Sequence, residues 1–340
     1  MPTKLIPLLA FVLTCGACAK PAVVPVPSDL IICANINRGY VIGSTIVTTN
    51  GLFRLDAAGV WRHFGYNDTT ITAVAFDPRD HAVIYTAALN GLWRSLDGGD
   101  SWRLLNSWDL TEGLDVAVDP NAPDHVYLAH TAGVAVSTDR GDTLEHRNQG
   151  LPERGRYAKT IEVDRTTAGR VLVGCETGVY LTENAGRDWR RVLPATATVN
   201  DVQQSPHDPA HWIAATDGQG VWASHDRGLT WQRLVALADA HAYYNVAFDP
   251  TTPGRIVVGG WHPGVWTSED GGKTWTDRNA GLPENPRAWR VGVHPQTGRL
   301  YASIVEESLY YSDDFGRTWQ PDVLEGSLVN CFVSLPRAQR

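Results

Sequence analysis

Short apolar stretches alternate with polar turns along almost the whole chain. Between residues 71 and 105, apolar stretches are interrupted at Asp77-Pro78, at Asn90 and at a polar turn that follows Ser95. These stretches are rich in β-branched and aromatic residues, so they predict strands rather than helices. The expected strands cover residues 71–78, 81–89, 91–95 and 101–105, and Asp77-Pro78 ends the first because Pro cannot continue a central ladder.

The polar turn after the third strand recurs along the chain at a nearly constant spacing. Its central Asp or Asn stands at positions 56, 97, 139, 184, 226, 270 and 314, and the successive gaps are 41, 42, 45, 42, 44 and 44 residues. Four antiparallel strands in each period of this length are typical of a β-propeller blade. The sequence therefore predicts an all-β, seven-bladed β-propeller of four-stranded antiparallel blades, over residues 30–336.

The residues of the turn have a physical explanation. The Asp carboxylate accepts hydrogen bonds from backbone N–H groups, the following Gly adopts a positive φ, and a Ser or Thr hydroxyl joins the local network. The pattern Ser/Thr-x-Asp-x-Gly-x-Thr/Ser-Trp resembles the Asp-box, also called the bacterial neuraminidase repeat. It is complete at Ser95, Ser224, Ser268 and Ser312, weaker at Ser137 and Thr182, and degenerate around Asp56.

This resemblance covers about Gly51 to Trp319 and points to the BNR-like and WD40/YVTN-like propellers. In families with this repeat, the boxes lie on the side of the ring away from the ligand. The resemblance therefore implies a structural role for the central residues of the boxes, namely Asp97, Asp139, Asn184, Asp226, Asp270 and Asp314.

The C-terminal segment is expected to close the ring. Residues 328–336 align with 71–78 as a further first strand, so we expect this strand to complete the first blade beside residues 29–36. A propeller is stable only when its last blade meets its first. Cys33 and Cys331 would then be neighbours, either as a disulfide in an oxidising compartment or as two buried thiols.

The N-terminus has the features of an export signal. Lys4 precedes an apolar run that is too short to span a membrane, and small residues follow it. Gly16-Ala17-Cys18 resembles the end of a bacterial lipobox, which would leave Cys18 lipidated, although Cys15 stands where Leu is usual; cleavage after Ala19 is the alternative. We expect a signal peptide over residues 1–18, a Pro-rich tether over 19–29 and a short tail over 337–340, in a periplasmic, cell-surface or secreted protein.

Composition narrows the function only by exclusion. The formal net charge of −8 and the absence of a basic cluster argue against nucleic-acid binding. Apart from the signal, the chain contains only Cys33, Cys175 and Cys331, with no CxxC pair and no His/Cys cluster, so we expect neither a metal nor a cofactor. We expect a monomer that touches a membrane only through an N-terminal lipid.

The ligand face should be formed by the loops at the other end of the strands. In the register of the first strands, Asp115, Asp201, Asn245 and Arg290 are expected to converge near the mouth of the central channel. Polar and aromatic groups of this kind suit a sugar or a peptide. The expected ligand-binding residues are His130, Asn245, Tyr243, Tyr244, Trp261, His262 and Arg290.

Three functions compete. A sialidase is disfavoured, because the chain lacks the early Arg-Ile/Leu-Pro motif of that family. A glycan-active enzyme resembling the xyloglucanases would use a carboxylate pair, Asp115 with Asp201 or Glu176 with Asp217, or as a lyase a base such as His241, Tyr244 or His262. A binding or assembly module resembling the photosystem II assembly factors and sortilin-type receptors needs no catalytic group. The sequence favours this third hypothesis, with a protein or polysaccharide as the ligand.

Overall fold

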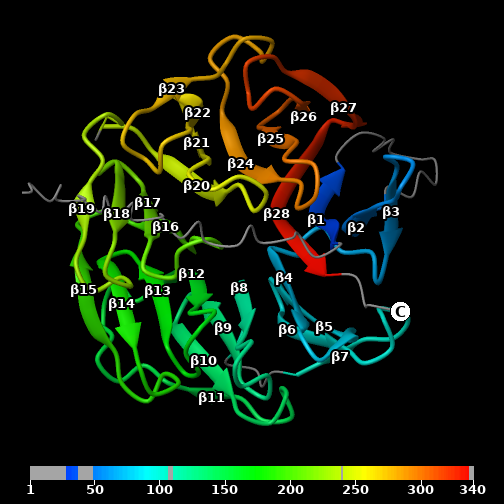
Figure 1. Ribbon diagram of the computed structural model, residues 1–340. Helices are drawn as coiled ribbons and strands as arrows, with labels where there is room; N and C mark the ends of the chain where they lie inside the picture. Colours follow the sequence, from blue (N-terminus) through cyan, green and yellow to red (C-terminus); the bar gives the residue numbers. More distant parts are fainter. Residues whose placement is uncertain (1–27, 37–48, 106–109, 239, 337–340) are drawn as a thin grey trace, which may run out of the picture.

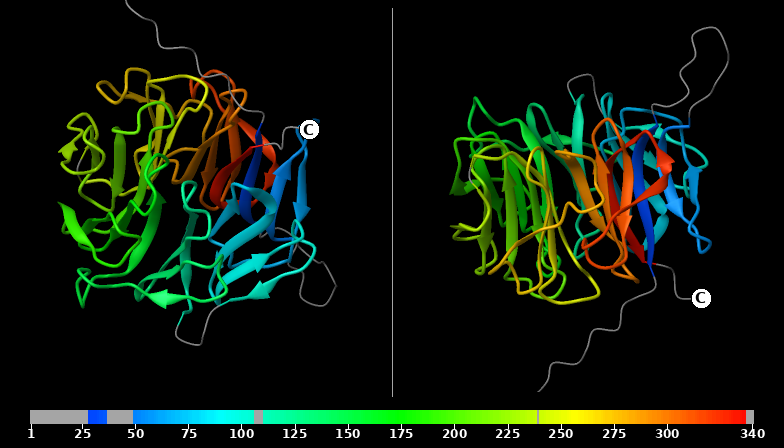
Figure 2. Two further views of the ribbon diagram at one scale, coloured as in Figure 1. Left: turned by 60° about the horizontal axis from the view of Figure 1, so that its bottom comes forward. Right: turned by 90° about the horizontal axis from the view of Figure 1, so that it is seen from above.

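The computed structural model describes residues 28–36, 49–105, 110–238 and 240–336. Within these ranges the regular secondary structure consists only of strands, which form seven four-stranded antiparallel sheets. The sheets stand as blades around a common axis (Figure 1), and Figure 2 shows the same ring tilted and from the side. The predicted seven-bladed propeller is confirmed. None of the described ranges holds a helix with the length and apolar character needed to span a bilayer.

Each blade is numbered by its place along the chain, and its strands are given from the channel outward. Blade 1 consists of β28 (Ser327–Pro336), β1 (Ser28–Ile36), β2 (Gly51–Leu55) and β3 (Trp61–Phe64). Blade 2 consists of β4 (Ala73–Asp77), β5 (Asp80–Ala88), β6 (Gly91–Ser95) and β7 (Arg103–Leu104). Blade 3 consists of β8 (Gly113–Val118), β9 (Val126–His130), β10 (Gly133–Ser137) and β11 (Glu145–His146).

The other four blades follow the same order. Blade 4 consists of β12 (Ala158–Val163), β13 (Val171–Cys175), β14 (Gly178–Thr182) and β15 (Arg190–Pro194). Blade 5 consists of β16 (Val199–Gln204), β17 (Trp212–Thr216), β18 (Val221–Ser224) and β19 (Gln232–Arg233). Blade 6 consists of β20 (Tyr243–Phe248), β21 (Ile256–Gly260), β22 (Gly264–Ser268) and β23 (Thr276–Asp277), and blade 7 of β24 (Ala288–Val293), β25 (Leu300–Ile304), β26 (Ser308–Ser312) and β27 (Gln320–Glu325).

The ring is closed by the two ends of the propeller. The C-terminal strand β28 pairs antiparallel with β1, as expected, and Cys33 lies opposite Cys331 in this register. The two cysteines form a disulfide across a sequence separation of 298 residues, while Cys175 is a buried free thiol. Strand β1 begins at Ser28, so it includes the last two residues of the expected tether. The expected signal peptide, Cys18 and the tail over 337–340 lie outside the described residues.

The Asp-box turns are held by their own polar side chains. In blade 6, Asp270 Oδ1 accepts hydrogen bonds from Thr274 N at 2.9 Å and Ser268 Oγ at 2.9 Å, and Oδ2 accepts from Thr274 Oγ1 at 2.6 Å. The hydroxyl and the N–H of Thr274 lower the pKa of Asp270 to about 2. In the copy with Asn, the Asn184 amide instead donates to Asp188 Oδ2 at 2.6 Å.

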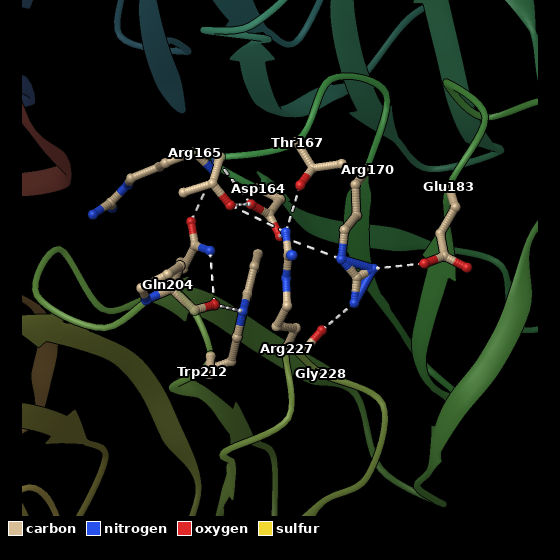
Figure 3. A network of polar contacts seen from close by, with 12 residues as sticks. Asp164, Arg165, Thr167, Arg170, Glu183, Gln204, Trp212, Arg227 and Gly228 are labelled. Atoms are coloured by element: carbon tan, nitrogen blue, oxygen red, sulfur yellow. Dashed lines mark hydrogen bonds and ion pairs between the residues drawn. The ribbon is translucent and has the colours of Figure 1, made fainter.

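Charged side chains on the Asp-box face join neighbouring blades (Figure 3). Arg227, from the box of blade 5, donates from Nη2 to Oδ2 of Asp164 in blade 4 at 2.7 Å. Asp164 is fully buried, and Arg170 Nε lies 3.2 Å from the same oxygen. The same arrangement recurs where Arg140 of blade 3 lies 3.2 Å from the buried Asp77 of blade 2. The charged side chains of the Asp-box face thus join neighbouring blades and stabilise the ring.

Candidate functional site

The inner strands of all seven blades enclose a central cavity of about 790 Å³. The seven positions of the expected register all line this cavity, namely Ala73, Asp115, Thr160, Asp201, Asn245, Arg290 and Cys331. The structure therefore brings together Asp115, Asp201, Asn245 and Arg290, which the sequence also groups.

Three of these side chains connect neighbouring inner strands. Asp115 Oδ2 accepts a hydrogen bond from the backbone N–H of Ile161 at 2.9 Å, in the next blade. Between blades 5 and 6, Asp201 Oδ2 accepts a hydrogen bond from the backbone N–H of Val246 at 2.9 Å. Asn245 Oδ1 then accepts from Val291 N at 2.6 Å. A repeated hydrogen bond of this kind, from a backbone N–H to a side chain of the preceding blade, satisfies the backbone donor and fixes the spacing between blades. Asp115, Asp201 and Asn245 therefore have a structural role.

A β-bulge lies beside this register in six of the seven blades. In β8, β12, β16, β20, β24 and β28 one extra residue interrupts the pairing. A bulge next to a functional site redirects a side chain. The extra residues occur where the inner strands reach the face opposite the Asp-boxes, and they are Leu114, Lys159, Asn200, Tyr244, Trp289 and Asn330.

An aromatic cluster forms one wall of this mouth. The ring centroid of Tyr244 lies 4.9 Å from that of Trp289 and 5.9 Å from that of Trp261. The guanidinium of Arg290 lies 4.5 Å from the centroid of Trp289, and that of Arg287 lies 5.0 Å from the centroid of Trp261. We call Tyr244, Trp261 and Trp289 the aromatic wall.

Lys159 reaches the aromatic wall from blade 4. Its Nζ lies 5.8 Å from the centroid of Trp289 and 6.0 Å from that of Tyr157. Burial, followed by the charge of Arg290, lowers the pKa of Lys159, and the charge of Asp217 opposes this shift. Lys159 and Trp289 are absent from the site residues that the sequence predicts. They could have been found as the neighbours of Thr160 and Arg290 in the repeat alignment. Only the structure shows that both occupy bulges, and that Lys159 lines the cavity together with Thr160.

The exposed carboxylates of this face flank Lys159 and Tyr157. Asp217 follows β17, and its charge acts on Lys159 and Tyr244. Glu176 follows β13, and its charge acts on Tyr157. His262 is exposed, with its ring centroid 6.4 Å from that of Trp261. His241 is half-buried, 6.5 Å from Tyr243.

Two predicted ligand contacts need correction. His130 is only 1% exposed, its Nδ1 accepts a hydrogen bond from Ala132 N at 3.3 Å, and its ring packs 5.3 Å from that of His146 on the outer strand of the same blade. Tyr243 is also 1% exposed and packs in the core of blades 5 and 6. Both side chains are directed into the protein at places where a bulge interrupts the strand pairing, which is at Leu114 opposite His130 and at Tyr244 next to Tyr243.

Two carboxyls in the channel are expected to make stability depend on pH. Burial raises the pKa of Asp115 and of Glu162 to about 7, and the charge of Asp201 adds to both shifts. The Ile161 N–H at Asp115 and the charge of Arg165 at Glu162 oppose them. Because these values exceed those of the unfolded chain, the folded state binds more protons between about pH 4 and 7. The contribution of these groups to the free energy of unfolding should therefore fall as pH rises through this window, by about 1–3 kcal/mol.

The measurement is urea unfolding at several pH values for the wild type and for the D115N/E162Q variant. Burial lowers the pKa of His211 to about 4, which acts in the opposite direction at acidic pH, so only the difference between the two proteins isolates the carboxyls. The variant should gain stability relative to the wild type as pH rises. Parallel pH profiles would contradict the expectation.

Comparisons with known proteins agree with the fold and the repeat. A family model described as Sortilin-Vps10 (sortilin, neurotensin receptor 3) matches residues 219–336. This match begins within blade 5, runs through blades 6 and 7 and ends with the closing strand β28. It contains three of the four complete boxes. The chain is an Asp-box β-propeller.

Curated relatives of this propeller include xyloglucanases. One is a probable oligoxyloglucan-reducing end-specific xyloglucanase of Neosartorya fischeri, 28% identical over 242 residues, which cover 64% of this chain and 28% of the relative. A xyloglucanase of Hypocrea jecorina is 25% identical, with 34% of its length covered. The chain thus spans about a third of these relatives or less.

Solved structures share the fold. The GH74 xyloglucanase of Xanthomonas campestris superposes with a TM-score of 0.65 at 19% identity, over 79% of this chain and 50% of that one. A structure of YCF48 bound to D1 peptide gives a TM-score of 0.56 at 17% identity, over 75% of this chain and 82% of that one. At such identities the likeness shows the fold alone.

Proposed function

We propose that this propeller is a glycan-active protein that holds a sugar chain at the channel mouth. The observation that carries the proposal is the aromatic wall of Tyr244, Trp261 and Trp289 at the mouth of a cavity whose lining includes charged and amide side chains. Aromatic faces pack against the apolar faces of sugar rings, while surrounding polar groups bind hydroxyls. The xyloglucanase relatives support the same ligand class, although each is a longer protein.

Glycoside hydrolysis requires two carboxyl groups, one acting as an acid and the other as a base or nucleophile. We assign these roles to Asp217 and Glu176, because both are exposed on the mouth face and flank Lys159 and Tyr157. Asp115 and Asp201 form the alternative pair, but their oxygens already accept backbone N–H groups. A lyase would instead take its base from Tyr244, His241 or His262.

A second candidate is a binding module for a protein segment. Its support is the structure of YCF48 bound to D1 peptide, a propeller that shares the fold of this chain. In this function the aromatic wall would hold a peptide and no carboxylate would be catalytic. For either function we propose an exported, monomeric protein, anchored through Cys18 if the lipobox is used.

The test measures binding and product release together. Purified protein is offered neutral and acidic plant and bacterial polysaccharides, with wild type, D217N, E176Q and W289A compared on each. Trp289→Ala should weaken binding by about tenfold or more, as loss of an aromatic stacking partner does. Turnover that disappears in Asp217→Asn while binding persists would support hydrolysis by the assigned pair.

Other outcomes separate the alternatives. Turnover lost only in Asp115→Asn or Asp201→Asn, in variants that still fold, would move catalysis into the channel. Binding without turnover in the wild type would leave a glycan-binding module. If no polysaccharide binds and a peptide does, the glycan proposal is overturned.

A further inference from the structure

Two positive charges share one ring at the channel mouth. The guanidinium of Arg290 and the ammonium of Lys159 lie 4.5 Å and 5.8 Å from the centroid of Trp289. Arg290 comes from β24 in blade 7 and Lys159 from β12 in blade 4, so the two groups approach from different sides of the ring of blades (Figure 1). The mouth therefore holds two cations against its aromatic wall.

Neither cation is neutralised by an ion pair within the described part of the chain. The Arg290 guanidinium donates to two backbone carbonyls, of Asn330 and of Trp289, each at 2.9 Å. By contrast, Arg287 on the same wall is paired with Glu306, with Nη2 and Oε2 2.5 Å apart. Charged side chains are almost never fully buried without a partner. Lys159 and Arg290 are half-buried at the mouth without an ion pair among the described residues, so a bound anion could supply the partner for both.

Three carboxyl groups influence these cations from a greater distance. Asp217 acts on Lys159, while Asp201 and Asp115 act on Arg290. Burial raises the pKa of both Asp115 and Asp201, which reduces the negative charge they carry. Lys159 and Arg290 also repel each other. An anion placed between them would relieve that repulsion.

We propose that the channel mouth selects an acidic sugar, whose carboxylate binds between Lys159 and Arg290 while its ring packs against the aromatic wall. The inference rests on the proposed glycan function and narrows the ligand to uronic-acid-containing polysaccharides. A planar guanidinium and an ammonium are the groups that bind carboxylates best. A neutral polysaccharide would leave the charges of Lys159 and Arg290 unpaired.

The distribution of lysines provides a matched control. The chain has only four lysines, at positions 4, 20, 159 and 273, so most of its positive charge is arginine. Lys273 is exposed in the Asp-box turn between β22 and β23, on the opposite face of the ring. Changing Lys273 therefore alters the net charge equally without touching the mouth.

The experiment compares uronic-acid oligosaccharides from galacturonan, alginate and glucuronoxylan with their carboxyl-reduced forms. Calorimetric titration at physiological salt is performed on the wild type, K159Q, K159R and K273Q. At least one acidic oligosaccharide should bind about tenfold more tightly than its reduced form. This preference should vanish in Lys159→Gln, be largely restored in Lys159→Arg and persist in Lys273→Gln.

A labelling experiment keeps the test independent of variant folding. The wild-type protein is acetylated with and without the acidic oligosaccharide, and the extent of modification at Lys159 and at Lys273 is compared by mass spectrometry. Ligand should protect Lys159 alone. If reduced oligosaccharides bind as tightly as acidic ones, the acidic preference is overturned and the glycan function stands. If no oligosaccharide of either kind binds, the acidic preference is overturned, and the glycan function fails with it only if the neutral polysaccharides do not bind either.

Discussion

Removing the Cys33–Cys331 disulfide should lower the free energy of unfolding by about 3–5 kcal/mol. The bond joins β1 to β28 across 298 residues of sequence, so it constrains a very large loop of the unfolded chain. In the chain-entropy model, stabilisation grows with loop length. The change to make is the C33S/C331S double variant, and the measurement is urea unfolding followed by tryptophan fluorescence.

Reductant supplies the control for this prediction. It should destabilise the wild type by nearly the same amount and leave the double variant unchanged, because Cys175 is a buried free thiol with no bond to break. Backbone pairing also joins β28 to β1 from Ser28 to Ile36, with a bulge after Cys33, and we expect the double variant to keep this pairing. A double variant as stable as the wild type would show that strand pairing alone closes the ring.

Replacing Asp201 with Ala should destabilise the fold by about 2–3 kcal/mol. The carboxylate accepts hydrogen bonds from Val246 N at 2.9 Å and Asn245 Nδ2 at 2.7 Å, and Val246 is buried. Without it, the N–H of Val246 has lost its acceptor, and an unsatisfied buried donor is costly. Asp201→Asn should cost less, because the amide oxygen can still accept from Val246. Thermal and urea unfolding measure both.

Asp217→Ala is the matched control for Asp201→Ala. Asp217 belongs to the same blade but is exposed, and substitutions at such surface positions usually change stability by about 0.5 kcal/mol or less. Equal stability of the Asp201→Ala and wild-type proteins would refute the structural role of Asp201. A folded Asp201→Asn protein that had lost turnover would return Asp201 to the catalytic candidates.

The repeat alignment correctly predicts which residues share the channel-lining position of the inner strands. The alignment groups Asp115, Asp201, Asn245 and Arg290 because each occupies the same place in its period, and all four line the cavity. It also groups Cys33 with Cys331 through the closing strand, and the structure joins them. These successes share one cause, since a regular repeat converts position in the sequence into position around an axis.

The errors arise where regular alternation is broken. His130 and Tyr243 appear suitable for ligand contact by residue type, yet both are packed inside the blades. Lys159 and Trp289 face the mouth because a bulge adds one residue to an inner strand. A bulge depends on how two strands pair, and strand pairing is not encoded by residue type at a single position.

The sequence by itself determined the number of blades, the strand order, the closing strand and the structural face of the ring. These follow from periodic turns and short apolar strands, which are local properties of the chain. Only the tertiary structure decided which polar side chains of the channel are bonded to the protein's own backbone and which are available to a ligand. Asp115 and Asp201 accept hydrogen bonds from backbone groups of the next blade, while Lys159 and Arg290 both lie close to the ring of Trp289. Contacts between residues some 40 to 130 positions apart depend on the way that the blades pack together.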